Sequence, residues 1–390
     1  MSDTHRPTTA TPSALSALPA TWHSENGTPP PRRLIAADDS LRAEAAYRLA
    51  CEGTALLWQG AYPDALRLLH AMRRRAERPR PQPRSVSDPD PDSPAEAFRK
   101  HRRERARLAR VLGMLLVPLD TDHRVTLDRA PDVREAGLAA YGPLLDNRIV
   151  SLRELLGVIG AHQWRVRGVE VPALGARIHP HYGVFSPVRG EYVDLVARAP
   201  LPPAALIHPT AHDLGTGTGV LAAVLARRGL RRVPVTDANP RALACARDNA
   251  HRLGLAGRIE TAGTALYPPG TDRTALVVCN PPWLPGRPTS TLDQGVYDQD
   301  SRMLHGFLDG LADRLLPGGE GWLILSDLAE RLGLRSRADL LGAVSGAGLR
   351  VIGRLDTVPR HPRATGTGRS DPLHRARADE VTSLWRLAPA

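Results

Sequence analysis

The strongest candidates for chemistry in this chain of 390 residues are four consecutive ones: Asn280, Pro281, Pro282 and Trp283. They follow the apolar run 275–279, which predicts a buried strand that ends in a turn. Two prolines in a row fix φ and lack N–H groups, so they form a stiff corner rich in carbonyl oxygens. The Asn280 side-chain oxygen and the Pro281 carbonyl could accept both hydrogens of a planar NH2 group, while the Trp283 indole stacks on its plane. The alternative is a structural Asn-Pro turn beside a core tryptophan.

A glycine-rich segment upstream favours a ligand site. Gly215, Gly217 and Gly219 alternate after an expected strand and before an expected helix. Glycines at such a junction let the backbone approach a ligand closely, and the start of the helix offers unpaired N–H groups. The dinucleotide fingerprint would require a glycine where the chain has Val220, which argues against a nicotinamide oxidoreductase.

An acidic residue ends the next expected strand. Asp237 follows the glycines by about 20 residues, where a carboxylate holds a ribose diol in nucleotide-binding α/β folds. Pro240 opens an expected helix, so Asp237 could also cap that helix. The two roles are compatible, and we expect the ribose role.

Together, residues 213–219, Asp237 and residues 280–283 resemble the class I S-adenosylmethionine-dependent methyltransferases. The resemblance is to their small-methyltransferase branch, which holds glutamine N-methyltransferases acting on release factors and amino-methyltransferases acting on adenine or guanine. It covers roughly residues 175–355 and places three motifs in the order and at the spacing of the family. It implies S-adenosyl-L-methionine as the cofactor and a seven-stranded sheet whose final strand is antiparallel.

The resemblance also implies roles for single residues. The catalytic residues would be the four of the Asn-Pro-Pro corner. The family often has an acid where this chain has Ala265, so we expect backbone groups or Thr264 to contact the adenine. The implied cofactor-binding residues are Asp213, Gly215, Thr216, Gly217, Gly219, Asp237, Asn239, Thr264, Ala265 and Asn280.

Two further segments fit the same branch loosely. Glutamine-methylating members carry a Pro-Arg-Pro-x-Thr-Glu segment ahead of the cofactor loop, and the matching positions here are Pro187, Arg189 and Glu191. The run 292–298 resembles a Val-x-x-Tyr-Glu-Pro-like stretch of that branch. Both matches favour a glutamine acceptor.

The acceptor stays open at this point. A nucleobase amine in RNA or DNA and a glutamine amide in a protein such as a release factor present nearly the same planar NH2 group, and a small metabolite is a third option. We expect an N-methyltransferase with a macromolecular acceptor. The alternative is a non-catalytic cofactor-binding or RNA-binding module. Such a module would not need the intact Asn-Pro-Pro-Trp corner.

The net charge of +11 is typical of nucleic-acid binding, but only Lys100 among the 52 basic residues is lysine, which indicates a coding bias toward arginine. The distribution of the charge is more informative. Residues 67–110 hold 14 basic and 6 acidic residues. This stretch is either a solvated helix face or a surface that contacts the phosphate backbone of RNA.

The remaining signals concern location and metals. Cys51, Cys245 and Cys279 show no Cys-x-x-Cys spacing, which indicates a reducing cytoplasm with no disulfide framework. No apolar stretch reaches the roughly 18 residues of a membrane span. His179 and His181 have no third ligand at a standard spacing, so no metal is expected. The oligomeric state is not predicted.

Strands and helices alternate from about residue 204, which is typical of a parallel sheet with helices on both faces. We therefore expect an α/β chain with a Rossmann-like seven-stranded methyltransferase sheet and a mainly helical N-terminal domain. Short strands are also expected at 168–172 and 183–186. The expected division is a disordered tail at 1–35, a helical segment at 36–78, a Pro-rich linker at 79–94, the rest of the accessory domain at 95–174 and the methyltransferase domain at 175–390.

Overall fold

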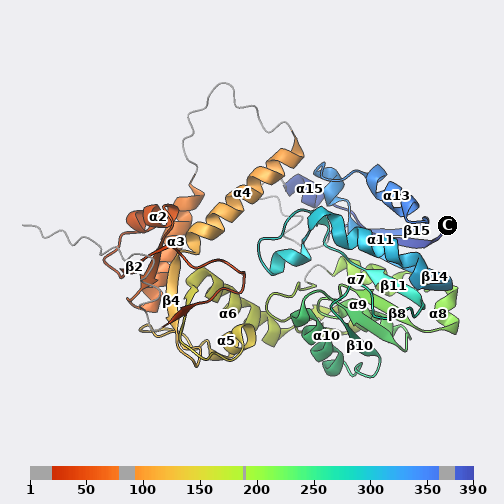
Figure 1. Ribbon diagram of the computed structural model, residues 1–390, viewed down its shortest axis with the longest axis horizontal. Coiled ribbons are helices and arrows are strands. Elements are labelled where there is room, and N and C mark those ends of the chain that lie inside the picture. The colour runs from red at the N-terminus through yellow and green to blue at the C-terminus, as the bar shows by residue number, and fades with distance from the viewer. Residues whose placement is uncertain (1–19, 79–92, 188–189, 360–373) are drawn as a thin grey trace, which may run out of the picture. The chain divides into compact units, whose positions relative to one another are not determined.

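The computed structural model of the chain describes residues 20–78, 93–187, 190–359 and 374–390 (Figure 1). It divides into two compact units. The smaller unit contains Arg99–Gln163 and the described residues before Asp90, and the larger one contains Pro91–Phe98 and Trp164–Ala390.

The division differs from the predicted boundary at 174/175, because Val171 and Leu174 pack into the core of the larger unit. Residues 1–19 of the predicted tail and residues 79–92 of the predicted linker lie outside the described residues. The last part of the tail is described, and the prediction of disorder is wrong there. Leu34 and Ile35 are buried in a strand, because they pair with a strand from later in the chain.

The larger unit is built on a seven-stranded sheet with the order β10-β9-β8-β11-β14-β16-β15. The strands from β10 to β14 pair in parallel, and β16, the last in the chain, runs antiparallel to both neighbours. This confirms the predicted sheet and its antiparallel final strand. The strands are β8 (Ala211–Leu214), β9 (Val233–Thr236), β10 (Ile259–Gly263), β11 (Thr274–Cys279), β14 (Leu315–Ser326), β15 (Leu349–Thr357) and β16 (Thr382–Pro389).

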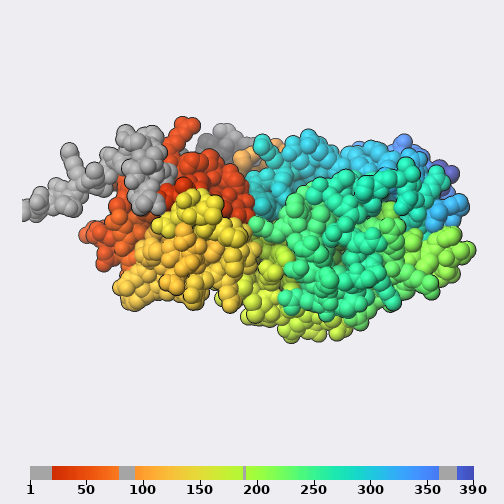
Figure 2. Space-filling model, turned by 60° about the horizontal axis from the view of Figure 1, so that its bottom comes forward, coloured from red at the N-terminus to blue at the C-terminus, as the bar shows by residue number. Residues whose placement is uncertain are grey.

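Helices cover both faces of this sheet. Residues of α7, α9 and α10 pack in one buried cluster with sheet residues, and residues of α11 and α13 pack in another. The green and teal segments, which include α10 and the residues after β11, form much of the surface of this unit on the face seen in Figure 2. The helices are α7 (Glu191–Arg198), α8 (Pro203–Ile207), α9 (Val220–Arg227), α10 (Pro240–Arg252), α11 (Arg302–Arg314), α12 (Leu328–Arg331), α13 (Arg337–Gly346) and α15 (His374–Ala378).

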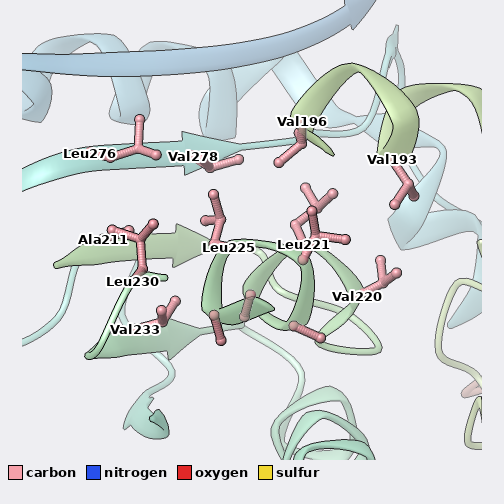
Figure 3. Close-up of a cluster of buried hydrophobic side chains, with 14 of the residues drawn as sticks. Val193, Val196, Ala211, Val220, Leu221, Leu225, Leu230, Val233, Leu276 and Val278 are labelled. Atoms are coloured by element: carbon pink, nitrogen blue, oxygen red, sulfur yellow. The ribbon is translucent and has the colours of Figure 1, made fainter. Parts of the chain in front are cut away.

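Strand β11 shows why the sheet is buried on both sides. Leu276 and Val278 belong to the first cluster, and Val277 and Cys279 belong to the second, because successive side chains of a strand point to opposite faces. Figure 3 shows Leu221 and Leu225 of α9 beside Leu276 and Val278 of β11, with which they share the first cluster. Full burial of each such side chain stabilises the fold by about 1.5–3 kcal/mol.

Short elements connect the main ones. Residues 183–186 form turns and coil, so the strand predicted there is wrong; Gly183 has a positive φ of 73°, which a strand does not accommodate. The strand predicted at 168–172 is confirmed as β6. The short elements are β6 (Val169–Val171), η1 (Pro172–Leu174), β7 (Ala176–Ile178), β12 (Leu284–Pro285), η2 (Leu292–Gly295), β13 (Tyr297–Asp298) and η3 (Gln299–Ser301).

The smaller unit contains more helix than strand, and its core includes a five-stranded sheet with the order β1-β5-β4-β3-β2. Strands β2, β3 and β4 run parallel, and β5 is antiparallel to β4. The boundary between the units falls within α4 and within α6. The elements that lie wholly or mostly in the smaller unit are β1 (Thr21–Trp22), β2 (Arg33–Ala37), α2 (Ala43–Cys51), β3 (Thr54–Trp58), α3 (Tyr62–Glu77), α4 (Pro94–Leu112), β4 (Leu115–Leu119), α5 (Arg134–Tyr141), β5 (Arg148–Ser151) and α6 (Leu152–Arg167).

Strand β3 corrects the prediction that 36–78 is helical throughout. Ala55 and Leu56 are fully buried between β2 and β4. A run of five residues with apolar side chains on both faces has neither the period of a helix nor that of a half-buried strand, so the sequence pattern does not separate it from the adjacent helices.

Candidate active site

The site lies where the order of the strands reverses. Strand β8 has β9 on one side and β11 on the other, although α9, β9, α10 and β10 separate β8 from β11 in the chain. Leu214 pairs with Cys279 at the carboxyl ends of these parallel strands, so Gly215 and Asn280 leave the sheet side by side. Open α/β sheets bind ligands at such a reversal.

A cavity of about 380 Å³ opens at this place, which is within the range of about 300–1,000 Å³ for small-molecule sites. Among the sequence-predicted site residues, Asp213, Gly219, Pro281 and Trp283 do not line it. The predicted residues that do line it are Gly215, Thr216, Gly217, Asp237, Asn239, Thr264, Ala265, Asn280 and Pro282.

The glycine-rich loop is tied to the next strand through its backbone. The N–H groups of Gly215 and Thr216 both donate to the Thr236 carbonyl at 2.9 Å. Gly215, Gly217 and Gly219 all have positive φ, between 54° and 79°, which L side chains adopt only at a cost. The loop therefore has a fixed shape that glycine alone adopts without strain.

Asp213 lies behind this loop. Its Oδ2 accepts hydrogen bonds from the Thr216 hydroxyl at 2.7 Å and the Ala222 N–H at 3.1 Å, and its Oδ1 is buried with no partner among the described residues. Burial raises the pKa of Asp213 to about 6, against the hydrogen bonds from Thr216 and Ala222, which lower it. The carboxyl thus shapes the loop and places a buried acidic group beneath the cavity.

Asp237 faces the cavity at the end of β9. Its two carboxylate oxygens accept from the Gly217 N–H and the Asn239 N–H, both at 2.9 Å, and burial raises its pKa. Each oxygen keeps a further lone pair for a ligand hydroxyl. Asn239, rather than Asp237, caps α10, because its side chain accepts from the Arg241 N–H at 3.0 Å.

The cavity fits a nucleoside at this end. A Cβ atom built on Gly217 would meet no protein atom within 4 Å, so the glycine leaves open space above the loop. Asp237 offers acceptors for a diol, and Ala265 and Leu266 add apolar walls. Gly219 serves packing instead, since a Cβ there would lie 3.0 Å from Cα of Ala246.

The Asn-Pro-Pro corner differs in one respect from the sequence-based expectation. The Trp283 indole N–H donates to Asn280 Oδ1 at 2.9 Å, and the half-buried indole packs against both core clusters of the larger unit. Trp283 thus holds the Asn280 side chain and is not among the residues that line the cavity. Asn280 Oδ1 retains a second lone pair, because an amide oxygen accepts two hydrogen bonds.

Sequence reasoning missed the opposite wall of the cavity. Asp300 and Ser301 both have positive φ, 57° and 52°, which is uncommon for residues other than glycine. The Asp298 carboxylate accepts from the N–H groups of Met303 and Leu304 at 3.1 Å and so fixes the start of α11. The run 292–298 was the sequence signal for this wall, which Thr291, Gln294, Gly295, Arg302 and Met303 line.

Residues of α10 hold the segment that contains His179 and His181, ahead of α7. The His179 N–H donates to Asn249 Oδ1 at 2.9 Å, and His181 Nε2 lies 3.1 Å from an Asp248 carboxylate oxygen. Burial lowers the pKa of His181. The two histidines therefore pack locally.

Of the loosely matching positions, Pro187 and Glu191 are buried, and Arg189 lies outside the described residues. The next residue after Glu191, Tyr192, lines the cavity. In the described ranges, no group of three or more His, Cys, Asp or Glu is placed to hold a metal ion, and no helix is long and apolar enough to cross a membrane.

Comparisons with known proteins agree with this geometry. Residues 176–330 match the family described as methyltransferase small domain. The chain is 41% identical over 118 residues to a release factor glutamine methyltransferase of Moorella thermoacetica. The aligned region covers 29% of this chain and 42% of that protein. The chain is 36% identical over 157 residues to the release factor glutamine methyltransferase of Bordetella pertussis, covering 34% and 58%.

A third relative is the ribosomal protein L11 methyltransferase of Pelotomaculum thermopropionicum, 42% identical over 71 residues that cover 18% of this chain and 23% of that protein. The chain spans less than two thirds of the length of each of these relatives. The family match coincides with the elements that form the cavity, from β7 to α12. Residues 176–330 of this chain, which include the residues that line the cavity, are therefore similar to the methyltransferase small domain family.

Proposed function

We propose that the protein transfers a methyl group to the planar amine nitrogen of a macromolecular acceptor. One observation carries the proposal: Asn280 lines the same cavity as Gly215 and Gly217, one strand away from the cofactor loop. A nitrogen held by Asn280 would therefore lie next to a ligand held by the loop.

The chain's residues act mainly by positioning. S-adenosylmethionine, when bound, supplies a methyl group already activated by its sulfonium charge. Gly217 and Asp237 are proposed to hold its nucleoside end, with Thr264 and Ala265 next to the adenine. The buried Asp213 contributes negative potential beneath a cationic ligand. Holding two reactants in line lowers the barrier by about 7–11 kcal/mol in favourable cases.

Asn280 acts on the acceptor nitrogen. Its lone pair is delocalised in an amide or a nucleobase, and the nitrogen becomes positive as the methyl group arrives. The Asn280 Oδ1, which lines the cavity, is proposed to accept one of its hydrogens, and this bond strengthens as the charge develops. Pro281 does not line the cavity, so its carbonyl is not assigned the second hydrogen. Trp283 orients Asn280 through its indole N–H, so it is a positioning residue.

We further propose that the acceptor is a glutamine side chain in a protein. The relatives named above as release factor glutamine methyltransferases support this, as do Pro187 and Glu191 at the positions expected for that branch. A terminal amide is small enough to enter the cavity that Asn280 lines, and the turn at 183–185 and η2 both contribute lining residues to it.

Transfer of radiolabel from S-adenosylmethionine tests the proposal. The full chain is incubated with host extract, which is then separated into protein, RNA and DNA fractions, and the labelled product is digested and identified. Label in N-methylglutamine is the expected result. Label in a methylated nucleobase would overturn the glutamine acceptor and leave methyl transfer standing. No label in any fraction, with saturable cofactor binding, would contradict transfer to a macromolecule.

A further inference from the structure

The positive charge of the chain is concentrated on two helical segments of the smaller unit. Residues 62–78 and 99–112 hold twelve Arg and Lys against three Asp and Glu, whereas the whole chain holds 52 against 41. These segments thus carry +9 of the net charge of +11. A coding bias toward arginine would raise the basic count along the whole chain and does not explain this concentration.

The two segments form one surface. Arg107 of α4 donates to the Ala76 carbonyl of α3 at 3.4 Å and to the Tyr47 hydroxyl at 3.1 Å, so the second half of α4 lies against the end of α3 (Figure 1). We call this the α3–α4 basic surface. Its exposed cations without a carboxylate partner among the described residues include Arg74, Arg99, Lys100, Arg103, Arg105 and Arg110.

Part of this arrangement costs the fold a little stability. Arg99 and Arg103 lie four residues apart, and like charges at that spacing destabilise a helix by about 0.2–0.5 kcal/mol per pair. Other arginines nearby are neutralised, such as Arg73 by Glu77 and Arg107 by Glu104. The unpaired cations are therefore available for an external anion.

The spacing of the cations indicates the kind of anion. Arg99, Arg103 and Arg110 share one face of α4 over about 17 Å, at about 1.5 Å per residue. Arginine binds phosphate oxygens through two parallel hydrogen bonds. The only Phe, Tyr or Trp of the two segments is the buried Tyr62, and the half-buried Tyr47 beside them bonds to Arg107, so neither segment offers an aromatic platform on which single-stranded bases would stack.

We propose that the α3–α4 basic surface binds the phosphate backbone of double-stranded RNA. In an A-form duplex the deep and narrow major groove brings two rows of phosphates close together, which matches a dense cluster of cations without aromatic side chains. Binding of this kind follows the shape and charge of the duplex and does not read its sequence. The proposed RNA binding does not involve the cavity of the larger unit, so it can be tested independently of the proposed methyl transfer.

Fluorescence anisotropy of the full chain with a labelled RNA duplex of about 16 base pairs tests this proposal. The variant Arg99→Gln, Lys100→Gln, Arg103→Gln, Arg110→Gln is compared with a matched control that removes four exposed cations of the larger unit: Arg227→Gln, Arg231→Gln, Arg247→Gln, Arg252→Gln. Both variants lose the same charge. Thermal unfolding checks that both fold.

We expect the α4 variant to bind about 100-fold more weakly near 0.1 M salt, and the slope of log K against log salt to fall by about one for each phosphate that is no longer neutralised. The control should bind within about threefold of the unaltered chain, since it keeps every cation of the α3–α4 basic surface. A salt-dependent affinity of the unaltered chain supports the proposal without relying on any variant.

Four results would overturn the proposal. They are no binding by the unaltered chain, an equal loss in the control variant, equal affinity for a DNA duplex of the same length, and full displacement of the RNA by an acidic peptide of equal charge. The last two would assign the surface to DNA or to an acidic protein instead.

Discussion

The two walls of the cavity are held in different ways. The cofactor wall is a glycine-rich loop whose N–H groups bond to the neighbouring strand and whose shape depends on positive φ angles at Gly215 and Gly217. The opposite wall is made of turns after β11, with two strained residues that are not glycine and with Asp298 fixing the start of α11. The shape of the first wall thus depends on glycines, whereas the second wall has its strained positions at residues other than glycine.

This difference predicts which measured quantity, cofactor affinity or the rate of transfer, a substitution in each wall should change. Changes in the cofactor wall should weaken cofactor binding, and changes around the Asn280 corner should slow transfer with little effect on cofactor affinity. Substitutions on each wall, paired with controls elsewhere in the fold, test that separation, and the cofactor loop should be the most sensitive place.

Gly217→Val should have the largest effect. The branched side chain would enter the open space above the loop and would force an L residue into a left-handed φ, which costs about 1–2 kcal/mol. We expect the affinity for S-adenosylhomocysteine, measured by titration calorimetry, to fall by about 100-fold or more. Gly270→Val is the matched control, because Gly270 also has a positive φ and open surroundings but lies outside the cavity. Comparable binding by both variants would contradict the role of the loop.

Asp237→Asn should weaken cofactor binding less. The amide keeps one acceptor for the two backbone N–H groups and loses the charge that strengthens hydrogen bonds to a diol. Such a bond contributes about 1.5–3 kcal/mol, so we expect a loss of about 10- to 100-fold in affinity. Binding of 2′-deoxy cofactor analogues should change little in the variant. If the variant discriminated against them as strongly as the unaltered chain does, Asp237 would not hold the ribose.

Trp283→Phe should slow transfer by about 5- to 10-fold, the equivalent of one neutral hydrogen bond. The ring that packs on the core stays, while the N–H that holds Asn280 Oδ1 is removed. The cofactor affinity should not change. Trp322→Phe is the control, because Trp322 also loses an indole N–H bond, to Glu320, but is buried in the core away from the cavity. Equal slowing in both variants would indicate a general loss of packing.

The last effect concerns stability and its dependence on pH. Burial raises the pKa of Asp213 from 3.8 to about 6, so the native state keeps a proton that the unfolded chain releases at lower pH. Stability therefore decreases as the pH rises from about 4 to about 6 and then levels off. The free energy of unfolding, measured by chemical denaturation, should fall by up to about 3 kcal/mol over this pH range in the unaltered chain. In Asp213→Asn this decrease should be absent. Asp339 should have the opposite pH dependence. Hydrogen bonds from Ser336 lower its pKa, so its contribution to stability is lost as the pH falls.

The larger unit could be predicted from the sequence because its signals are local. Gly215, Gly217 and Gly219 mark the end of one strand, Asp237 marks the end of the next, and Asn280 follows an apolar run. The alternation of strands and helices predicted the parallel sheet, and the family resemblance that these motifs carry implied its seven strands. The placement of the residues in one cavity then follows from the parallel pairing of Leu214 with Cys279.

The parts that the sequence did not reveal depend on distant contacts. Strands β2 and β3 are short apolar runs that become strands only when they pair with each other and with β4. Asp300 and Ser301 take a backbone conformation that their residue types do not predict. The bond from Trp283 to Asn280 depends on a rotamer, which residue spacing does not determine.

The central claim is that Asn280 serves the acceptor, while the loop beside it serves the cofactor. The most direct test measures label transfer and S-adenosylhomocysteine affinity on the same preparation of Asn280→Ala. We predict that transfer falls by about 100- to 1,000-fold, as for the loss of one group that stabilises developing charge, with the affinity within about threefold of the unaltered chain. A matching loss in both measurements would place Asn280 in the cofactor wall, and unchanged transfer would contradict its role toward the acceptor.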